Sequence, residues 1–311
     1  MTKRIFAFGC SFTEYLWPTW ADIIGRSFSQ QHGYEYYNIG NSGSGNYYIL
    51  NSLFWADKKY NFTTDDIIMI MWSSWNREDR YILDYNWNPD LRGQWTKEGG
   101  ILNAVYHSKY FTEDFFRYWS LENDIASNVL SIELARKVYN IDFEEHITIW
   151  EQSAQLDDNV PNLELPEAIY QMFLKTSDEA QDSGTWGKIN SKYNGNDYNA
   201  GRARQPVEPY IVTVNEHDAH FVPAAHLDYV KAAVPTIRGL ETVTKETEIY
   251  IKGFSDRMRI LVTKEGFDEA IKTIIDKHLR EQKDYCAGTY KDLWYDAWPL
   301  DMLRTFVPKG K

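Results

Sequence analysis

Short apolar runs alternate with helical patterns over the first 80 residues of the chain. Residues 5–8 and 67–71 are unbroken apolar runs, and residues 34–39 form a third strand candidate that ends at a glycine-rich turn. Apolar residues at helical spacing follow over 20–28 and 47–60. Repeated strand–loop–helix units predict an α/β layer fold with a mostly parallel central sheet.

The pattern is less regular between residues 81 and 205. An amphipathic stretch over 112–139 predicts one or two helices, and residues 146–150 resemble a fourth strand. Apolar content then falls and turn-forming residues accumulate. We therefore expect an α/β domain over residues 1–235 that carries a helical and loop insertion at about 81–205.

Residues 236–311 predict a C-terminal extension. Residues 248–252 and 258–262 resemble the two strands of a β-hairpin, and residues 266–282 predict an amphipathic helix. This extension is either an appended module or additional cover for the sheet.

Ser11 directly follows the first predicted strand, in a tight turn that begins with Gly9. In open parallel sheets, ligands and catalytic groups gather beyond the carboxyl ends of the strands. A serine in this position presents its hydroxyl at the functional edge and is a candidate nucleophile. The alternative is an ordinary helix cap, a role in which serine is common.

A serine nucleophile needs a base, and the base needs an orienting carboxylate. His220 and Asp218 lie together just before a helix predicted to begin near Pro223. The alternative for Asp218 is a helix-start carboxylate. A zinc site is a further alternative, because His217, His220 and His226 fall within ten residues, but no second cluster of acidic and histidine residues completes a ligand set. We therefore expect no metal and no cofactor.

The tetrahedral intermediate of acyl transfer needs hydrogen-bond donors aimed at its oxyanion. Gly43 lies in a glycine-rich turn, and Asn76 follows the strand predicted over 67–71, so both belong to loops that should face the same side as Ser11. The candidate oxyanion donors are the amides of Ser11 and Gly43 and the side chain of Asn76. Taken singly, Gly43 is also explained as a turn glycine and Asn76 as a helix cap.

Four segments resemble, in the same order, the four sequence blocks of the SGNH/GDSL hydrolases. They are residues 9–13 (Gly-Cys-Ser-Phe-Thr), 38–43 (Asn-Ile-Gly-Asn-Ser-Gly), 72–76 (Trp-Ser-Ser-Trp-Asn) and 218–226, which contains Asp218, His220 and Pro223. The resemblance covers about residues 1–80 and 210–235 and implies a flavodoxin-like three-layer α/β/α sandwich. It also implies a serine esterase in which Ser11 is the nucleophile, His220 the base and Asp218 the orienting carboxylate.

The match departs from the family pattern in three places. Cys10 stands where the first block has aspartate, a residue to which the family assigns no direct chemical step. The third block lacks its glycine and its second acidic residue, so Ser74 and Arg77 are alternatives to Asn76. The last block has an Asp-x-His spacing where many members have Asp-x-x-His. This spacing, with Trp-Ser-Ser in the third block, most resembles the branch encoded by tailed bacteriophages.

Composition limits the classes of binding partner that we expect. The formal net charge of −12 argues against binding to a phosphate backbone, so we expect no nucleic acid partner. No apolar run is long enough to span a bilayer and no secretory signal is evident, so we expect no membrane association and a soluble protein that is cytoplasmic or virion-associated. Cys10 and Cys286 are expected to be free thiols.

The expected activity is hydrolysis of an ester through an acyl-enzyme. Aromatic residues make up 16 % of the chain, and such rings suit a sugar surface as well as a core, which favours a carbohydrate ester such as an O-acetyl group over other small-molecule esters. One alternative is a catalytically silent SGNH-like scaffold or carbohydrate-binding protein, associated with virion proteins or with a second copy of this chain. The other is an O-acyltransferase that uses the same triad.

Overall fold

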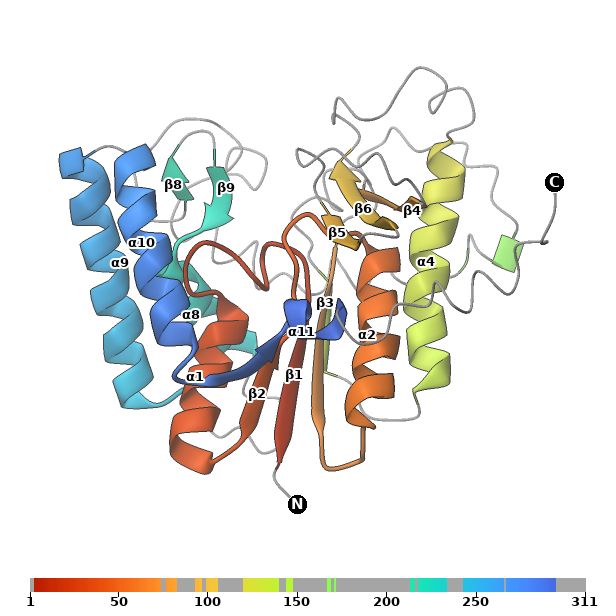
Figure 1. Cartoon of the computed structure of the whole chain (residues 1–311), viewed down its shortest axis with the longest axis horizontal. Coiled ribbons are helices and arrows are strands. Elements are labelled where there is room, and N and C mark those ends of the chain that lie inside the picture. The colour runs from red at the N-terminus through yellow and green to blue at the C-terminus, as the bar shows by residue number, and fades with distance from the viewer. Residues whose placement is uncertain are drawn as a thin grey trace.

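A parallel sheet of five strands lies at the centre of the computed structural model (Figure 1). The structure describes residues 3–73, 77–82, 93–96, 99–105, 120–139, 144–147, 167–168, 171, 213–215, 218–233, 243–265 and 267–294. The strands follow the order β10 (Cys286–Thr289), β2 (Glu35–Asn38), β1 (Arg4–Gly9), β3 (Ile67–Trp72) and β7 (Glu144–Ile147). Every neighbouring pair is parallel, so the carboxyl ends meet at one edge, which we call the carboxyl edge. The α/β class and the parallel sheet are confirmed.

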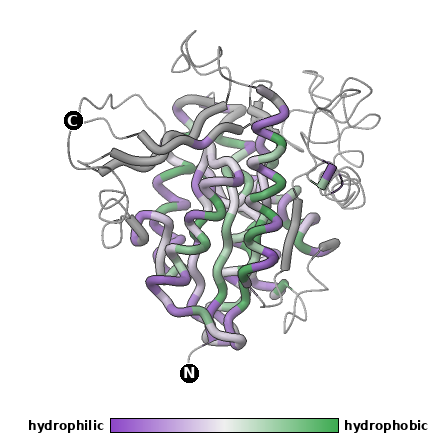
Figure 2. The backbone as a smooth tube through the Cα atoms, turned by 90° about the vertical axis from the view of Figure 1, so that its right-hand side faces the viewer, coloured by the Kyte–Doolittle hydropathy of each residue, from purple (hydrophilic) through white to green (hydrophobic). Residues whose placement is uncertain are grey.

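Helices cover both faces of this sheet, because its central strands are apolar on both sides. Ile5 and Met69 belong to one buried cluster, and Phe6 and Ile70 belong to another. The first cluster includes residues of α1 (Trp20–His32), α8 (Pro223–Ala233), α9 (Lys245–Glu265) and α10 (Phe267–Gln282), and the second includes residues of α2 (Asn46–Tyr60) and α4 (Leu121–Val138). Figure 1 shows these two groups of helices on opposite sides of the sheet. Figure 2, viewed from the α4 side, shows hydrophobic and hydrophilic residues interleaved along the helices.

The β-hairpin expected over 248–252 and 258–262 is wrong, because both ranges lie within α9. Ile251, Phe254 and Met258 repeat at a spacing of three and four residues and are at most 4 % exposed, which is the periodicity of a helix face. Ile251 and Met258 lie close in sequence to the exposed apolar residues Ile249 and Ile260, and these neighbours together give the two short apolar runs the appearance of strands. The amphipathic helix expected over 266–282 is confirmed as α10.

The chain returns to the central sheet after α10. Tyr285 is buried in the first cluster, and β10 then pairs with β2 at the end of the sheet. The short helix α11 (Tyr290–Trp294) begins where β10 ends and therefore lies at the carboxyl edge. The residues expected to form a C-terminal extension thus supply one strand of the sheet and two of its covering helices.

Part of the expected insertion forms strands instead of helices and loops. Strands β4 (Arg77–Ile82), β6 (Gly99–Val105) and β5 (Gly93–Thr96) pair in that order as an antiparallel sheet. The helix expected within 112–139 is observed as α4, and β7 takes up the start of the strand expected at 146–150. The rest of the insertion lies largely outside the described residues.

A separate antiparallel pair, β8 (Thr213–Asn215) and β9 (Asp218–Phe221), stands above the carboxyl edge in Figure 1. The helix predicted to begin near Pro223 is observed as α8, which begins at that residue. None of the helices in the described part of the chain combines the length with the apolar character that crossing a bilayer requires.

A buried hydrogen-bond network joins the C-terminal elements to the first helix. Asp22, in the first turn of α1, is 1 % exposed and accepts from Gln282 Nε2 at 3.0 Å and from the Tyr285 hydroxyl at 3.3 Å. Asn38 Nδ2 of β2 also donates to Asp22 Oδ1 at 3.4 Å. His278 Nε2 lies 3.8 Å from Asp22 Oδ2. Burial lowers the pKa of His278 even though Asp22 opposes the shift, so the imidazole is neutral at pH 7.

Replacing Asp22 with alanine is expected to lower the free energy of unfolding by about 3 kcal/mol, because Gln282 and Tyr285 would stay buried without their acceptor. The matched control is Asp65→Asn, which changes an exposed carboxylate just before β3 and should cost less than about 0.5 kcal/mol. Urea unfolding followed by circular dichroism measures both variants. Equal stability of the two variants would show that the network does not hold α10 to α1.

Candidate functional site

The loop after β1 places Ser11 at the carboxyl edge of the sheet. The amides of Thr13 and Glu14 both donate to the carbonyl of Cys10, at 2.8 and 3.1 Å, so the chain turns sharply around Ser11. Ser11 is 4 % exposed. The predicted nucleophile therefore lies in a hydrogen-bonded turn at the end of a buried strand.

The side chain of Thr13 packs between the loops that follow β1 and β2. A Cβ atom on Gly9 would lie 2.0 Å from Thr13 Oγ1, and one on Gly40 would lie 2.8 Å from Thr13 Cγ2. The close approach of the two loops therefore requires glycine at both positions. The amide of Asn41 also donates to the carbonyl of Gly9 at 3.0 Å. These contacts hold the loop of Gly43 against the loop of the nucleophile.

Gly43 adopts a backbone conformation that favours glycine. Its φ of 90° lies in the left-handed region. Ser44 closes the turn by donating to the carbonyl of Asn41 from both its amide, at 3.1 Å, and its hydroxyl, at 2.6 Å. Gly43 is partly exposed at the carboxyl edge, as a backbone donor to a bound substrate must be.

Asn46 links the start of α2 to the residue that follows β3, and Asp79 links the start of α2 to β4. Asn46 Nδ2 donates to the carbonyl of Ser73 at 3.0 Å, and its Oδ1 accepts from the amide of Ser73 at 2.6 Å. Asp79 of β4 accepts from the amides of Gly45 and Tyr48, at 2.9 and 2.8 Å, and so caps the first turn of α2. The sequence analysis missed both residues, because each contacts a segment that is distant along the chain.

Some of the predicted site residues lie outside the described residues. These are Asn76, its alternative Ser74, and His217. Arg77 begins β4, and Asp218 begins β9. The parts of the proposed triad and oxyanion hole that depend on Asn76 and on the Asp218 carboxylate stay predictions.

His220 of β9 lies against the loop that follows β1. Its ring stacks on Tyr15, with centroids 3.7 Å apart and planes 19° from parallel, and lies 5.2 Å from the ring of Phe12. The structure therefore brings the predicted base to the loop of the predicted nucleophile. The pairing of the Ser11 hydroxyl with the His220 imidazole stays a prediction.

The neighbouring His226 belongs to the core. It is 1 % exposed, and its pKa is lowered to about 3, first by burial and then by the nearby His220. His226 is therefore neutral at pH 7. Among the described residues, no group of three or more His, Cys, Asp or Glu side chains is arranged to hold a metal ion.

Glu14 is a titratable group at this edge that the sequence analysis did not single out. Its pKa is raised to about 8, first by burial and then by the charge of Asp22. Lys291 and a hydrogen bond from the backbone amide of Ser42 oppose this shift. At pH 7 the carboxyl group is therefore mostly protonated, and it lies beside the residue that precedes Gly43.

Residues from the C-terminal part of the chain reach the same edge. Strand β10 ends at the carboxyl edge and leads directly into Tyr290 and Lys291 of α11. The pKa of Tyr290 is raised to about 12, first by burial and then by the charge of the nearby Glu14. Nothing local in the sequence connects these residues to Ser11, because the link is the pairing of β10 with β2.

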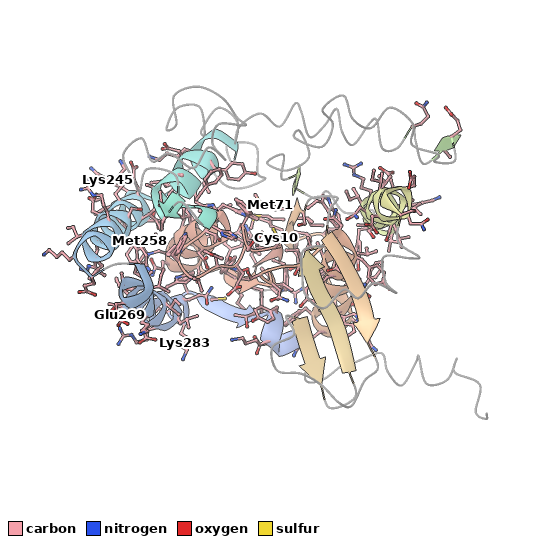
Figure 3. All side chains as sticks on the ribbon, turned by 90° about the horizontal axis from the view of Figure 1, so that it is seen from above. Cys10, Met71, Lys245, Met258, Glu269 and Lys283 are labelled. Carbon is pink, nitrogen blue, oxygen red and sulfur yellow. The ribbon has the colours of Figure 1, made fainter. Side chains whose placement is uncertain are left out.

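Cys10 belongs to the core although it is next to the predicted nucleophile. It is 1 % exposed and packs in the first cluster together with Met71. Figure 3 looks down on the carboxyl edge and shows Cys10 and Met71 near the centre, with Lys245 and Glu269 on the outer helices and Lys283 just after the end of α10. Both cysteines are free, and burial raises the pKa of Cys286 to about 12, so its thiol stays protonated.

Comparison of the chain with protein-family models, with curated proteins and with solved structures finds no match. Two loops and one strand at the carboxyl edge form the candidate site, with Ser11 in the loop after β1, Gly43 in the loop after β2 and His220 in β9, which rests on the loop of Ser11.

Proposed function

We propose that the protein is a serine esterase with the three-layer α/β/α fold of the SGNH hydrolases. The observation that carries this proposal is the packing of His220 of β9 against the loop of Ser11, although the two residues are far apart along the chain. The turn of Gly43, held against the same loop through Thr13, supports it. The four matching sequence blocks follow the same order along the chain.

In the proposed reaction, the Ser11 hydroxyl attacks the carbonyl carbon of an ester and His220 accepts the hydroxyl proton. Asp218 orients the imidazole. The oxyanion of the tetrahedral intermediate receives hydrogen bonds from the amides of Ser11 and Gly43 and from Asn76. The intermediate collapses to an acyl-enzyme as His220 returns the proton to the leaving alcohol. Water, activated by His220, then attacks the acyl-enzyme, which releases the acid and regenerates Ser11.

The proposed substrate is a carbohydrate ester such as an O-acetyl group. Aromatic residues make up 16 % of the chain, and such rings suit the apolar face of a sugar. The resemblance to the phage-encoded branch favours a virion-associated or cytoplasmic protein that acts on a surface sugar. An O-acyltransferase would differ only in passing the acyl group to a sugar hydroxyl.

A catalytically silent scaffold is the second candidate function. The observation that favours it is the third sequence block, which lacks the glycine and the second acidic residue of the family pattern. In this case the carboxyl edge would bind a carbohydrate without turning it over.

Hydrolysis of p-nitrophenyl acetate by the wild type and by Ser11→Ala distinguishes the esterase from the catalytically silent scaffold. The esterase predicts measurable turnover that falls by about 1000-fold or more in Ser11→Ala. Ser29→Ala, which removes a partly exposed hydroxyl on α1, is the matched control and should keep full activity. Absence of turnover in folded wild type, or equal turnover in wild type and Ser11→Ala, would contradict the esterase and favour the scaffold.

A further inference from the structure

The segment from Phe12 to Trp17 holds strand β9 by side-chain contacts. Trp17 is fully buried and its Nε1 donates to the carbonyl of Phe221 at 2.8 Å. Phe12 meets the ring of Phe221 edge to face, with centroids 5.8 Å apart. Tyr15 stacks on His220, and the ring of Trp17 in turn packs edge-on against Tyr15 at 4.6 Å. The loop of the nucleophile therefore contacts both of the last two residues of β9.

These contacts matter because β9 is not part of the central sheet. Among the described strands, β9 pairs only with β8, so no backbone ladder fixes its position relative to β1. In a central strand, the register of hydrogen bonds would determine which residues face each other. For β9 this task falls to side chains, and the rings of Tyr15 and Phe12 both lie against the imidazole itself, with Tyr15 the closer at 3.7 Å against 5.2 Å.

The stack on Tyr15 does not block hydrogen bonding by the nitrogens of the His220 imidazole, which occurs in the plane of the ring. A parallel stack occupies one face of the imidazole, whereas both nitrogens hold their hydrogen-bonding atoms in the plane of the ring. His220 is partly exposed, so the edge of the ring is not enclosed by this contact. Tyr15 can therefore fix the plane of the ring while one nitrogen faces a carboxylate and the other a hydroxyl.

We propose that Tyr15 is a positioning residue that fixes the plane of the His220 imidazole relative to the Ser11 loop. This inference rests on the proposed esterase function. The aromatic ring of Tyr15 performs the task, and its hydroxyl is not required for it. A misplaced base lowers the rate of proton transfer while leaving substrate affinity largely unchanged, because small errors in alignment are costly in the chemical step.

The experiment compares Tyr15→Phe, which keeps the ring, with Tyr15→Leu, which removes it. Tyr34→Leu is the matched control, because Tyr34 is also a partly buried tyrosine but packs on Phe28 at the end of α1. We expect Tyr15→Leu to lower kcat for p-nitrophenyl acetate by about 10- to 100-fold with KM within about threefold. Tyr15→Phe should restore kcat to within about threefold of wild type, and Tyr34→Leu should leave it unchanged.

A second measurement tests the stack without relying on activity. The side-chain proton resonances of His220, assigned with His220→Gln, should carry a ring-current shift that Tyr15→Leu reduces and Tyr15→Phe retains, while the ring of Phe12 still contributes in every variant. Full kcat in Tyr15→Leu, or a rise in KM with kcat unchanged, would overturn the positioning role and leave the esterase intact. Turnover that is absent in wild type would overturn the esterase itself, and His220 resonances that are the same in wild type and Tyr15→Leu would overturn the stack independently.

Discussion

A chain that stops at residue 242 is expected not to fold, which is the largest effect that the structure predicts. The deletion removes α9, α10 and β10, whose buried side chains share one cluster with Ile5 and Ala7 of β1. It also exposes the edge of β2 to solvent, because β10 is its outer neighbour. Circular dichroism and dye binding should show a collapsed or aggregated chain without the cooperative unfolding transition of the full-length protein.

A point substitution tests the same prediction in the intact chain. Phe254→Ala in α9 should lower the free energy of unfolding by about 3–5 kcal/mol, because the side chain is 4 % exposed in the shared cluster. Ile249→Ala, on the same helix but 62 % exposed, is the control and should cost less than about 0.5 kcal/mol. If the region were an appended module, Phe254→Ala would produce a separate early transition and leave the rest of the unfolding curve unchanged.

The elements that the sequence predicts well are those that a single local pattern specifies. The run over Ile67–Trp72 is apolar at every position and is buried on both faces, so its pattern and its environment agree. Strand β10 is the opposite case. Its sequence, Cys-Ala-Gly-Thr, has no apolar run, and it becomes a strand because it pairs with β2. Long-range pairing of this kind leaves no signal in the local sequence.

The residues of the candidate site also fall into those that a local motif predicts and those that only contacts between distant segments bring to the site. Ser11, Gly43 and His220 could be predicted because each follows or lies in a short motif whose chemistry is recognisable from neighbouring residues. Tyr15 is one aromatic residue among many in the sequence, and its stack on His220 of β9 is what distinguishes it. Lys291 reaches Glu14 only through the pairing of the last strand of the sheet. What the sequence could not supply is therefore the set of contacts made between distant segments.

Above pH 8, ester hydrolysis by the wild type is expected to fall, and Glu14→Gln should remove that fall. The pKa of Glu14 is raised from its ordinary value of 4.5 to about 8, so the carboxyl group is neutral at pH 7 and ionised at pH 9. Ionisation places a negative charge at the amide of Ser42, next to the Gly43 amide that is proposed to bind the oxyanion, and so opposes charge development in the transition state. If only the neutral form is active, kcat/KM falls roughly fivefold between pH 8 and pH 9.

The groups around Glu14 do not account for such a fall. They are Asp22 of α1, Tyr36 of β2, and Tyr290 and Lys291 of α11. Tyr290 has its pKa raised to about 12 and Tyr36 has its pKa raised well above 10, so both stay neutral at pH 9. Of Glu14 and these two tyrosines, Glu14 is the group whose pKa of about 8 fits a fall between pH 8 and pH 9.

The measurement is the pH profile of kcat/KM for p-nitrophenyl acetate in wild type, Glu14→Gln and the exposed control Asp65→Asn, corrected for spontaneous hydrolysis. The free energy of unfolding as a function of pH provides an independent check, because the direction of its change is defined. Folding raises the pKa of Glu14, so the stabilising contribution of its neutral form is complete below about pH 4.5 and is lost as the pH rises through about 8. Glu14→Gln should therefore gain stability relative to wild type over that interval. A stability gain without a change in the pH profile would show that Glu14 lies near the oxyanion loop but does not influence the reaction, and an alkaline fall that persists in Glu14→Gln would assign it to another group.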